Sequence, residues 1–270
     1  MKRWISTWSI GPNAELAHFQ KIKEAGFAGV EIWCEHKRAL VYLEYARQCG
    51  LEIGMHLPFH DLNFATPDIA VWNHAEKVLI EWMKKLREYE GVHATLHGGY
   101  AWASEERDEA VEKVKKRLTA MAAIAAELGV ELLLENLIAD RLNYSHHIAS
   151  HFSEWKSLLD EANVKACLDV GHLLVMKENI EDVIAKLGGL LAAVHYSDND
   201  GASDLHLLPD GKNSAANGVL ETLRQMNFKG PIVYELNPYR YSLQDILHYV
   251  SEEKNSHLFE KQESIETGNR

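Results

Sequence analysis

The stretch VKACLDVGH, Val164–His172, decides which fold we expect for this chain. A short apolar run, Val164–Leu168, leads directly into the carboxylate of Asp169. A Val-Gly step, which we expect to be flexible, and a histidine follow. A short apolar run bounded by such residues is typical of a buried strand. The stretch therefore predicts a strand that delivers a functional side chain at its end.

Five other apolar runs end in residues that can bind a metal ion or move a proton. If the runs are neighbouring parallel strands of one barrel, all six end groups converge at one mouth. The five runs and their end residues are EIGMH with His56, HATLH with His97, LLLEN with Glu135, AAVHYSD with His195 and PIVYEL with Glu235.

Strand-like and helix-like segments alternate along the chain, a pattern typical of a parallel sheet with crossover helices. The length of 270 residues suits one α/β barrel. The sequence predicts a single-domain (β/α)8 TIM barrel over residues 1–252 and a polar C-terminal tail at 253–270. The expected strands are 3–9, 28–33, 51–56, 92–97, 130–135, 164–168, 190–196 and 231–236; the expected helices are 13–25, 39–49, 68–89, 104–128, 153–162, 180–187, 215–226 and 243–252, with Asn13 and Ser104 as two of the caps.

Composition and charge narrow the classes of partner. The chain carries 28 Lys and Arg against 40 Asp and Glu, and an acidic surface repels nucleic-acid backbones. No run approaches the roughly 18 apolar residues of a membrane span, and the N-terminus does not resemble a signal peptide. Three scattered cysteines indicate neither a disulfide framework nor a cysteine zinc site. We expect a cytoplasmic protein without nucleic-acid or membrane partners; a homo-oligomer stays open.

Three of the strand-end residues are carboxylates, Glu135, Asp169 and Glu235, and burial makes an unpaired carboxylate costly. Mutual repulsion would raise their pKa values unless a cation lies among them. A divalent metal ion, with His195 as a neutral fourth ligand, resolves that conflict. The oxygen-rich set suits Mn²⁺, Mg²⁺ or Co²⁺, and Zn²⁺ is also compatible. For any one of these residues considered alone, the alternative to metal binding is a salt bridge at the end of its strand.

A second ring of candidates surrounds these four. His172 lies three residues after Asp169, and Asp204 and His206 flank one residue, so both can reach one metal. With His56 and His97 they could hold further ions or orient a substrate. Trp33 is one of several strand-end aromatics that could stack on a sugar or pack the mouth. Arg141 and Arg240, in strand-end loops, are the candidates for contacting an anionic substrate.

Several of these segments together resemble the xylose isomerase-like barrel superfamily, which contains sugar and sugar-phosphate isomerases and epimerases and endonuclease IV. The resemblance covers about residues 3–250. Its motifs are MHLPF, LHGG, LLLEN, LDVGH, VHYSDND, SDLH and YEL.

The two branches of this superfamily imply different ligand sets. The epimerase-like branch implies one metal ion on Glu135, Asp169, His195 and Glu235, with His172 on substrate oxygens. The endonuclease IV-like branch implies three zinc ions. Pro209-Asp210-Gly211 replaces the Gly-x-Gly turn usual after the Asp-x-His motif, which argues against the geometry at His206 that the extra metals need. The nine residues of the three-zinc set are His56, His97, Glu135, Asp169, His172, His195, Asp204, His206 and Glu235.

We rank three functions. The first is a metal-dependent sugar or sugar-phosphate isomerase/epimerase, in which Glu135 and Glu235 exchange protons through an enediolate and His172 polarises an oxygen. The second is an inosose-dehydratase-like lyase, which also removes a proton next to a carbonyl. The third is an endonuclease IV-like zinc phosphodiesterase acting on abasic DNA.

Overall fold

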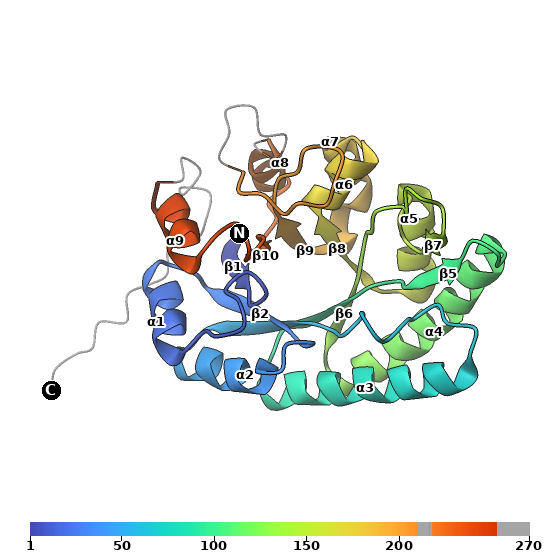
Figure 1. The fold of residues 1–270 in the computed structure, drawn as a ribbon, viewed down its shortest axis with the longest axis horizontal. Helices are drawn as coiled ribbons and strands as arrows, with labels where there is room; N and C mark the ends of the chain where they lie inside the picture. The colour runs from blue at the N-terminus through green and yellow to red at the C-terminus, as the bar shows by residue number, and fades with distance from the viewer. Residues whose placement is uncertain (210–215, 217, 253–270) are drawn as a thin grey trace, which may run out of the picture.

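The computed structural model describes residues 1–209, 216 and 218–252, whose main feature is a closed barrel of eight parallel strands (Figure 1). Each barrel strand pairs with the next one along the chain, and Lys2 lies opposite Pro231 where the first and last strands close the ring. The expected fold is confirmed. The barrel strands are β1 (Lys2–Ser6), β2 (Gly29–Trp33), β3 (Glu52–His56), β4 (His93–Leu96), β6 (Glu131–Glu135), β8 (Lys165–Asp169), β9 (Leu191–Tyr196) and β10 (Pro231–Tyr234).

Helices follow the strands and lie around the outside of the barrel (Figure 1). Their apolar faces pack on the outer faces of the strands in one large core. No helix in the described part of the chain combines the length and apolar character needed to cross a membrane. The helices are α1 (Leu16–Glu24), α2 (Ala39–Gln48), α3 (Ile69–Glu88), α4 (Arg107–Leu128), α5 (Phe152–Ala162), α6 (Val170–Met176), α7 (Ile180–Leu187), the 3-10 turn η1 (Gly188–Leu190), α8 (Val219–Gln225) and α9 (Leu243–Glu252).

Two predicted helix starts were wrong because local hydrogen bonds cap the chain later. Helix α1 begins after Glu15, whose backbone N–H donates to His18 Nδ1 at 2.9 Å, rather than at residue 13. Helix α4 begins after Glu106, because Glu105 closes a turn with Trp102 that holds residue 104 outside the helix. The predicted start of the helix at 215 and the predicted tail at 253–270 lie outside the described residues.

Three elements that border the mouth of the barrel were missed, two short strands and one helix. Strands β5 (Tyr100–Trp102) and β7 (Ser145–His147) form a small antiparallel sheet beyond the ends of β4 and β6. The Val-Gly step after Asp169, expected to be flexible, is the first turn of α6. A Cβ on Gly171 would lie 2.6 Å from Asn199 Nδ2, so glycine is needed here for close packing rather than for flexibility.

The two-residue period of the strands places the candidate residues in one layer inside the barrel. Leu133, Cys167 and Ala193 form a small cluster separate from the outer core, as expected of inward-facing positions. The residue two positions further along each strand points to the same face, toward the inside of the barrel. At those positions the side chains are polar. They belong to Glu135, Asp169 and His195 on these three strands.

Candidate metal centre at the mouth of the barrel

Four buried side chains from adjacent strands converge at the carboxyl end of the barrel. His195 Nδ1 on β9 lies 3.3 Å from Glu135 Oε1 on β6 and 3.0 Å from Glu235 Oε2 just after β10. Asp169 Oδ2, at the end of β8, lies 4.0 Å from the same nitrogen. The ligand atoms of all four residues lie within 4.8 Å of one another, a spacing at which one metal ion could be held.

The hydrogen bonds of His195 show which of its nitrogens faces the carboxylates. Its Nε2 lies 2.8 Å from Glu31 Oε1, and the ionised carboxylate of Glu31 can only accept. His195 therefore donates Nε2–H to Glu31, and in the neutral ring Nδ1 presents a lone pair to three carboxylates. Neither His195 Nδ1 nor Asp169 Oδ2 has a hydrogen-bond partner within the described residues. A divalent cation fits this set, since it would satisfy both atoms.

The pKa of Asp169 reflects the same shortage of positive charge. Burial, reinforced by the nearby carboxylate of Glu135 and opposed by His172, raises the pKa of Asp169 to about 6. A group this deep in the protein resists ionisation unless a cation compensates it. The side chain is also anchored, because Asp169 Oδ1 accepts from the backbone N–H of His172 at 2.6 Å as the N-cap of α6.

Glu31 adjoins the candidate site through His195, and the pattern of strand-end residues did not predict it. It is fully buried on β2 and accepts from His93 Nε2 at 2.8 Å and Thr95 Oγ1 at 3.2 Å as well as from His195. Burial opposes its ionisation, but His195 and His93 outweigh that and hold its pKa below the usual range. Its signal in the sequence was a charged residue inside the apolar run GVEIW.

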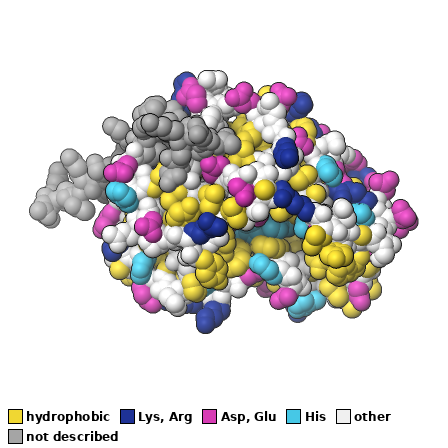
Figure 2. Space-filling model, turned by 45° about the horizontal axis from the view of Figure 1, so that its top comes forward, with side chains coloured by type: hydrophobic (Ala, Val, Ile, Leu, Met, Phe, Trp, Pro, Cys, Tyr) yellow, Lys and Arg dark blue, Asp and Glu magenta, His cyan; other side chains and the backbone are white. Residues whose placement is uncertain are grey.

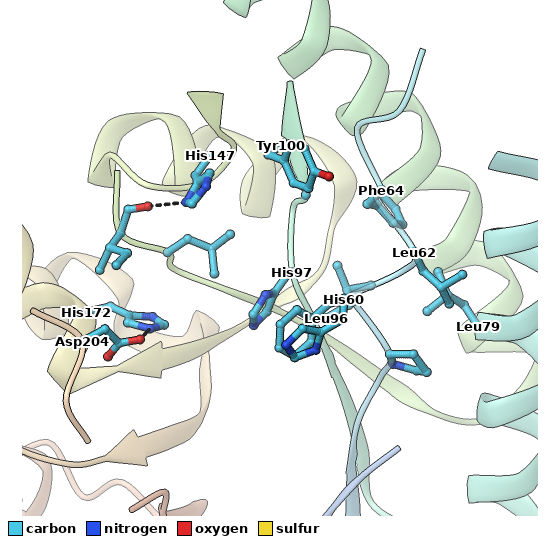
Figure 3. A pocket seen from close by; sticks show the side chains of 15 residues that line it. His60, Leu62, Phe64, Leu79, Leu96, His97, Tyr100, His147, His172 and Asp204 are labelled. Atoms are coloured by element: carbon cyan, nitrogen blue, oxygen red, sulfur yellow. Dashed lines mark hydrogen bonds and ion pairs between the residues drawn. The ribbon is translucent and has the colours of Figure 1, made fainter. Parts of the chain in front are cut away.

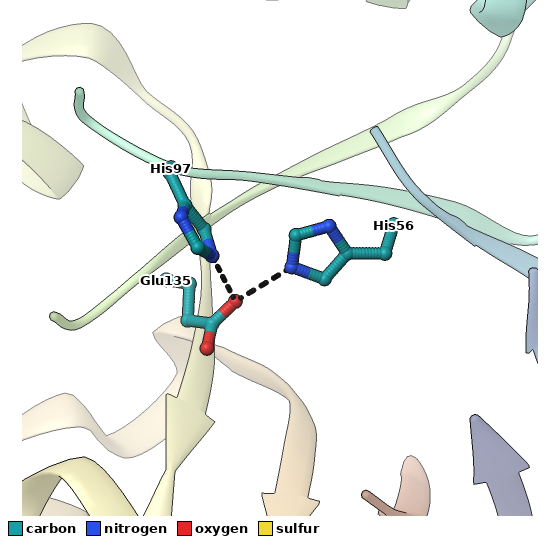
Figure 4. Close-up of side chains that lie close together, drawn as sticks. All are labelled: His56, His97 and Glu135. Carbon is teal, nitrogen blue, oxygen red and sulfur yellow. Dashed lines mark hydrogen bonds and ion pairs between the residues drawn. The ribbon is translucent and has the colours of Figure 1, made fainter. Parts of the chain in front are cut away.

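A second group joins the first through Glu135 (Figure 4). His56 Nε2 and His97 Nε2 lie 3.2 and 3.3 Å from the same oxygen, Glu135 Oε2. His56 Nδ1 donates to the carbonyl of Leu57 at 3.1 Å, which leaves Nε2 facing the carboxylate. Burial opposes protonation of both rings. For His56 the hydrogen bond to Glu135 prevails and raises the pKa to about 9, whereas burial lowers the pKa of His97.

A third group forms on the other side, where Asp204 lies between two histidines. His172 Nε2 is 3.3 Å from Asp204 Oδ2, and His206 Nε2 is 3.2 Å from Asp204 Oδ1. The Nδ1 atoms of these rings donate to the backbone carbonyls of Asn136 and Glu235 at 2.7 and 3.0 Å. Residues 210 and 211 of the unusual turn lie outside the described residues, so its expected effect on the extra metals stays a prediction. His206 itself has a positive φ of 47°, and its bond to the carbonyl of Glu235 leaves Nε2 facing Asp204.

The histidines share a pattern that is typical of metal ligands, in which the outer nitrogen donates a proton and fixes the tautomer. His56, His172 and His206 donate Nδ1–H to carbonyls and offer Nε2. In His195 the two nitrogens exchange roles, because Nε2 donates to Glu31 and Nδ1 faces the carboxylates. All nine residues of the larger predicted ligand set therefore lie in three adjoining groups, which could hold up to three ions.

The three groups border a cavity of about 250 Å³. Trp33, as expected, lines it together with Trp8, and their rings meet edge to face at 6.3 Å. Figure 2 shows this side of the molecule with histidines visible in a hollow bordered by hydrophobic side chains. Arg141 and Arg240 are exposed and do not line this cavity. They also do not line a neighbouring cavity that shares His97, His172 and Asp204 with it, so the structure does not bring the two arginines to the candidate metal ligands.

Comparisons with known proteins agree with this architecture. The uncharacterized protein MJ1311 of Methanocaldococcus jannaschii is 26% identical over 246 residues, which cover 87% of this chain and 83% of that protein. A D-tagatose 3-epimerase-like protein superposes with a TM-score of 0.78 at 24% identity, over 96% of this chain and 100% of that one. For the 3-keto-D-glucoside 4-epimerase YcjR from E. coli the TM-score is 0.75 at 21% identity, over 93% and 99%.

The family model described as xylose isomerase-like TIM barrel matches residues 19–255, nearly the whole barrel. This match confirms the resemblance drawn from the strand-end motifs. The chain belongs to the xylose isomerase-like TIM barrel family.

Proposed function

We propose that this chain is a metal-dependent isomerase or epimerase of a sugar or sugar phosphate. The observation that carries the proposal is the pair Glu135 and Glu235, whose carboxylates lie 3.3 and 3.0 Å from His195 Nδ1 and line the same cavity. Two carboxylates around one cation are the parts that a proton transfer next to a carbonyl requires. The names of the two structurally similar epimerases support the same reaction class.

The residues that would hold the cation are Glu135, Asp169, His195 and Glu235. When bound, it would polarise a substrate carbonyl and acidify the neighbouring C–H bond. We assign Glu235 as the base because it has fewer histidine contacts than Glu135. Within the described residues Glu235 contacts His195 Nδ1 at 3.0 Å and Ser6 Oγ at 3.4 Å, whereas four histidines lie near Glu135. In the proposed reaction Glu235 removes the proton, Glu135 returns one, and His172 Nε2 orients a substrate oxygen.

Solvent exchange across a panel of sugars tests this assignment. Ketoses and aldoses are incubated with the metal-loaded protein in D₂O, and NMR follows the C–H next to the carbonyl. We expect deuterium incorporation for the true substrate and its loss, by about 1,000-fold, in Glu235→Gln. Glu81→Gln, on the exposed face of α3, is the matched control. An unchanged exchange rate in Glu235→Gln would remove Glu235 from the mechanism.

The product of the same incubation separates an isomerase from a dehydratase-like lyase. Both reactions begin with removal of a proton beside a carbonyl, so the exchange experiment alone does not distinguish them. An isomer or epimer of unchanged mass supports the proposal, and a product lighter by one water assigns the chain to the lyase reaction.

A zinc phosphodiesterase is the second candidate, because the structure brings the two additional groups around Glu135 and Asp204 into the same cavity. Clustered ions could stabilise both the attacking and the leaving oxygen of a phosphodiester. The protein loaded with zinc is incubated with abasic duplex DNA, with His97→Ala as the comparison. Incision that is lost in His97→Ala would support this candidate, and no incision with the metals loaded rejects it. The acidic charge of the chain counts against it.

A further inference from the structure

A second cavity, of about 340 Å³, opens beside the candidate metal centre (Figure 3). It borders the first, because Phe59, His60, His97, His172 and Asp204 line both. The remainder of its wall is mainly apolar. The apolar side chains that line this cavity and not the first are Pro58, Leu62, Phe64, Leu79, Leu96, Leu137 and Ile138.

The outer wall of this cavity is held in place by polar contacts rather than by apolar packing alone. Asn63 donates to the carbonyl of Tyr100 at 2.7 Å and accepts from its N–H at 2.9 Å, which fastens the loop after β3 to β5. Arg117 donates to the carbonyls of Phe64 and Thr66, each at 2.8 Å. A Cβ on Gly99 would lie 2.5 Å from Asn63 Oδ1, so the closeness of the two loops depends on that glycine. The cavity is therefore preformed.

The chemistry of the wall selects the kind of group that fits. A free sugar carries hydroxyls on nearly every carbon, and the Leu, Ile and Phe side chains offer them no hydrogen-bond partner. An apolar cavity of about 150 Å³ is enough to bind benzene, so this one accepts a phenyl ring or a short alkyl chain. Tyr100 and His147, paired across β5 and β7, supply polar groups at one border.

We propose that the substrate carries an aromatic or alkyl substituent, which this cavity binds while the hydroxylated part lies at the metal centre. This inference rests on the proposed function, which places the reacting sugar of the substrate at the metal centre. The substrate class is then an apolar conjugate of a sugar that keeps a carbonyl, such as an aryl or alkyl glycoside with a keto group on the sugar ring, rather than a free sugar.

Two hydroxamates test the pairing of the two cavities, because a hydroxamate chelates divalent metals through two oxygens. Titration calorimetry on the metal-loaded protein compares acetohydroxamate with 3-phenylpropionohydroxamate. We expect the phenyl compound to bind at least about tenfold more tightly, from burial of its ring. The gain should vanish in Ile138→Trp, which fills the cavity, and in Leu62→Asn. It should persist in Leu142→Asn, an exposed site in the same loop as Ile138. Equal affinities in the wild type, or a gain kept in both cavity variants, would overturn the proposal.

A metal-independent measurement separates this inference from the proposed function. Ligand-observed NMR with benzyl alcohol is run on the protein in excess chelator. Binding that disappears in Ile138→Trp supports the apolar cavity even if acetohydroxamate fails to bind, which would count against the metal centre alone. No binding of benzyl alcohol to the wild type overturns the inference.

Discussion

Two buried groups of charged residues inside the same barrel differ in how their charges are balanced. The lower layer is Glu31 with its partners His93, Thr95 and His195, and the upper layer is Glu135, Asp169 and Glu235. In the lower layer the carboxylate of Glu31 accepts from His93, Thr95 and His195. In the upper layer, despite burial, the histidines around Glu135 and Glu235 hold the pKa of both carboxyls below the usual range, whereas burial raises the pKa of Asp169, whose Oδ2 has no hydrogen-bond partner within the described residues. The difference indicates that hydrogen bonds from the protein balance the lower layer, and it supports our proposal that the upper layer receives a cation.

The largest effect should come from neutralising the upper layer with Asp169→Asn. Asparagine can still accept from the N–H of His172 and cap α6, so the fold should persist. We expect affinity for Mn²⁺ or Zn²⁺ to fall by about 100-fold or more, because a charged ligand is lost. Without metal at pH 8, the variant should be more stable than the wild type by roughly 1–3 kcal/mol, since a buried repulsive charge is gone. Isothermal titration and urea unfolding measure the two quantities; a less stable apo variant would contradict our comparison.

The lower layer should respond with the opposite sign of stability. Glu31→Gln removes a charged acceptor from two buried histidines, and so we expect a loss of roughly 1–3 kcal/mol with or without metal. Because His195 also loses the partner that fixes its tautomer, metal affinity should fall by about 10- to 100-fold. The half-exposed Glu52→Gln on β3 is the control. Unchanged metal affinity in Glu31→Gln would show that Glu31 does not orient His195.

The pH dependence of the apo protein should show the charge of Asp169 in stability alone, without a change in metal affinity. The pKa of Asp169 is about 6 in the folded chain, above its unfolded value, so the folded state holds the extra proton. Its stabilising contribution is complete below pH 4 and is lost as the pH rises through 6, by on the order of 3 kcal/mol. Urea unfolding between pH 4 and 8 should show this loss in the wild type but not in Asp169→Asn. Parallel curves for the two proteins would place the raised pKa elsewhere.

The sequence predicted the barrel and the upper layer because both follow from local patterns. Apolar runs that end in Glu135, Asp169 or Glu235 indicate a strand and its last inward residue together. The lower layer was not predicted, because Glu31 lies in the middle of β2 and His93 at the start of β4, away from the strand ends that converge at the mouth. Helix α6 was missed because Gly171 in the sequence is typical of a turn. In the structure a glycine is needed there because Ser197 and Asn199, in the loop after β9, pack closely against it.

Metal content per chain tests the central claim most directly. The protein is purified without chelators and its metals are measured by elemental analysis, before and after dialysis against Mn²⁺, Mg²⁺, Co²⁺ or Zn²⁺. We predict at least one divalent ion per chain, held by the group around His195. Two or three ions would add the groups around His56 and Asp204 as sites. A chain that contains no metal and takes none up would contradict the account of the upper layer.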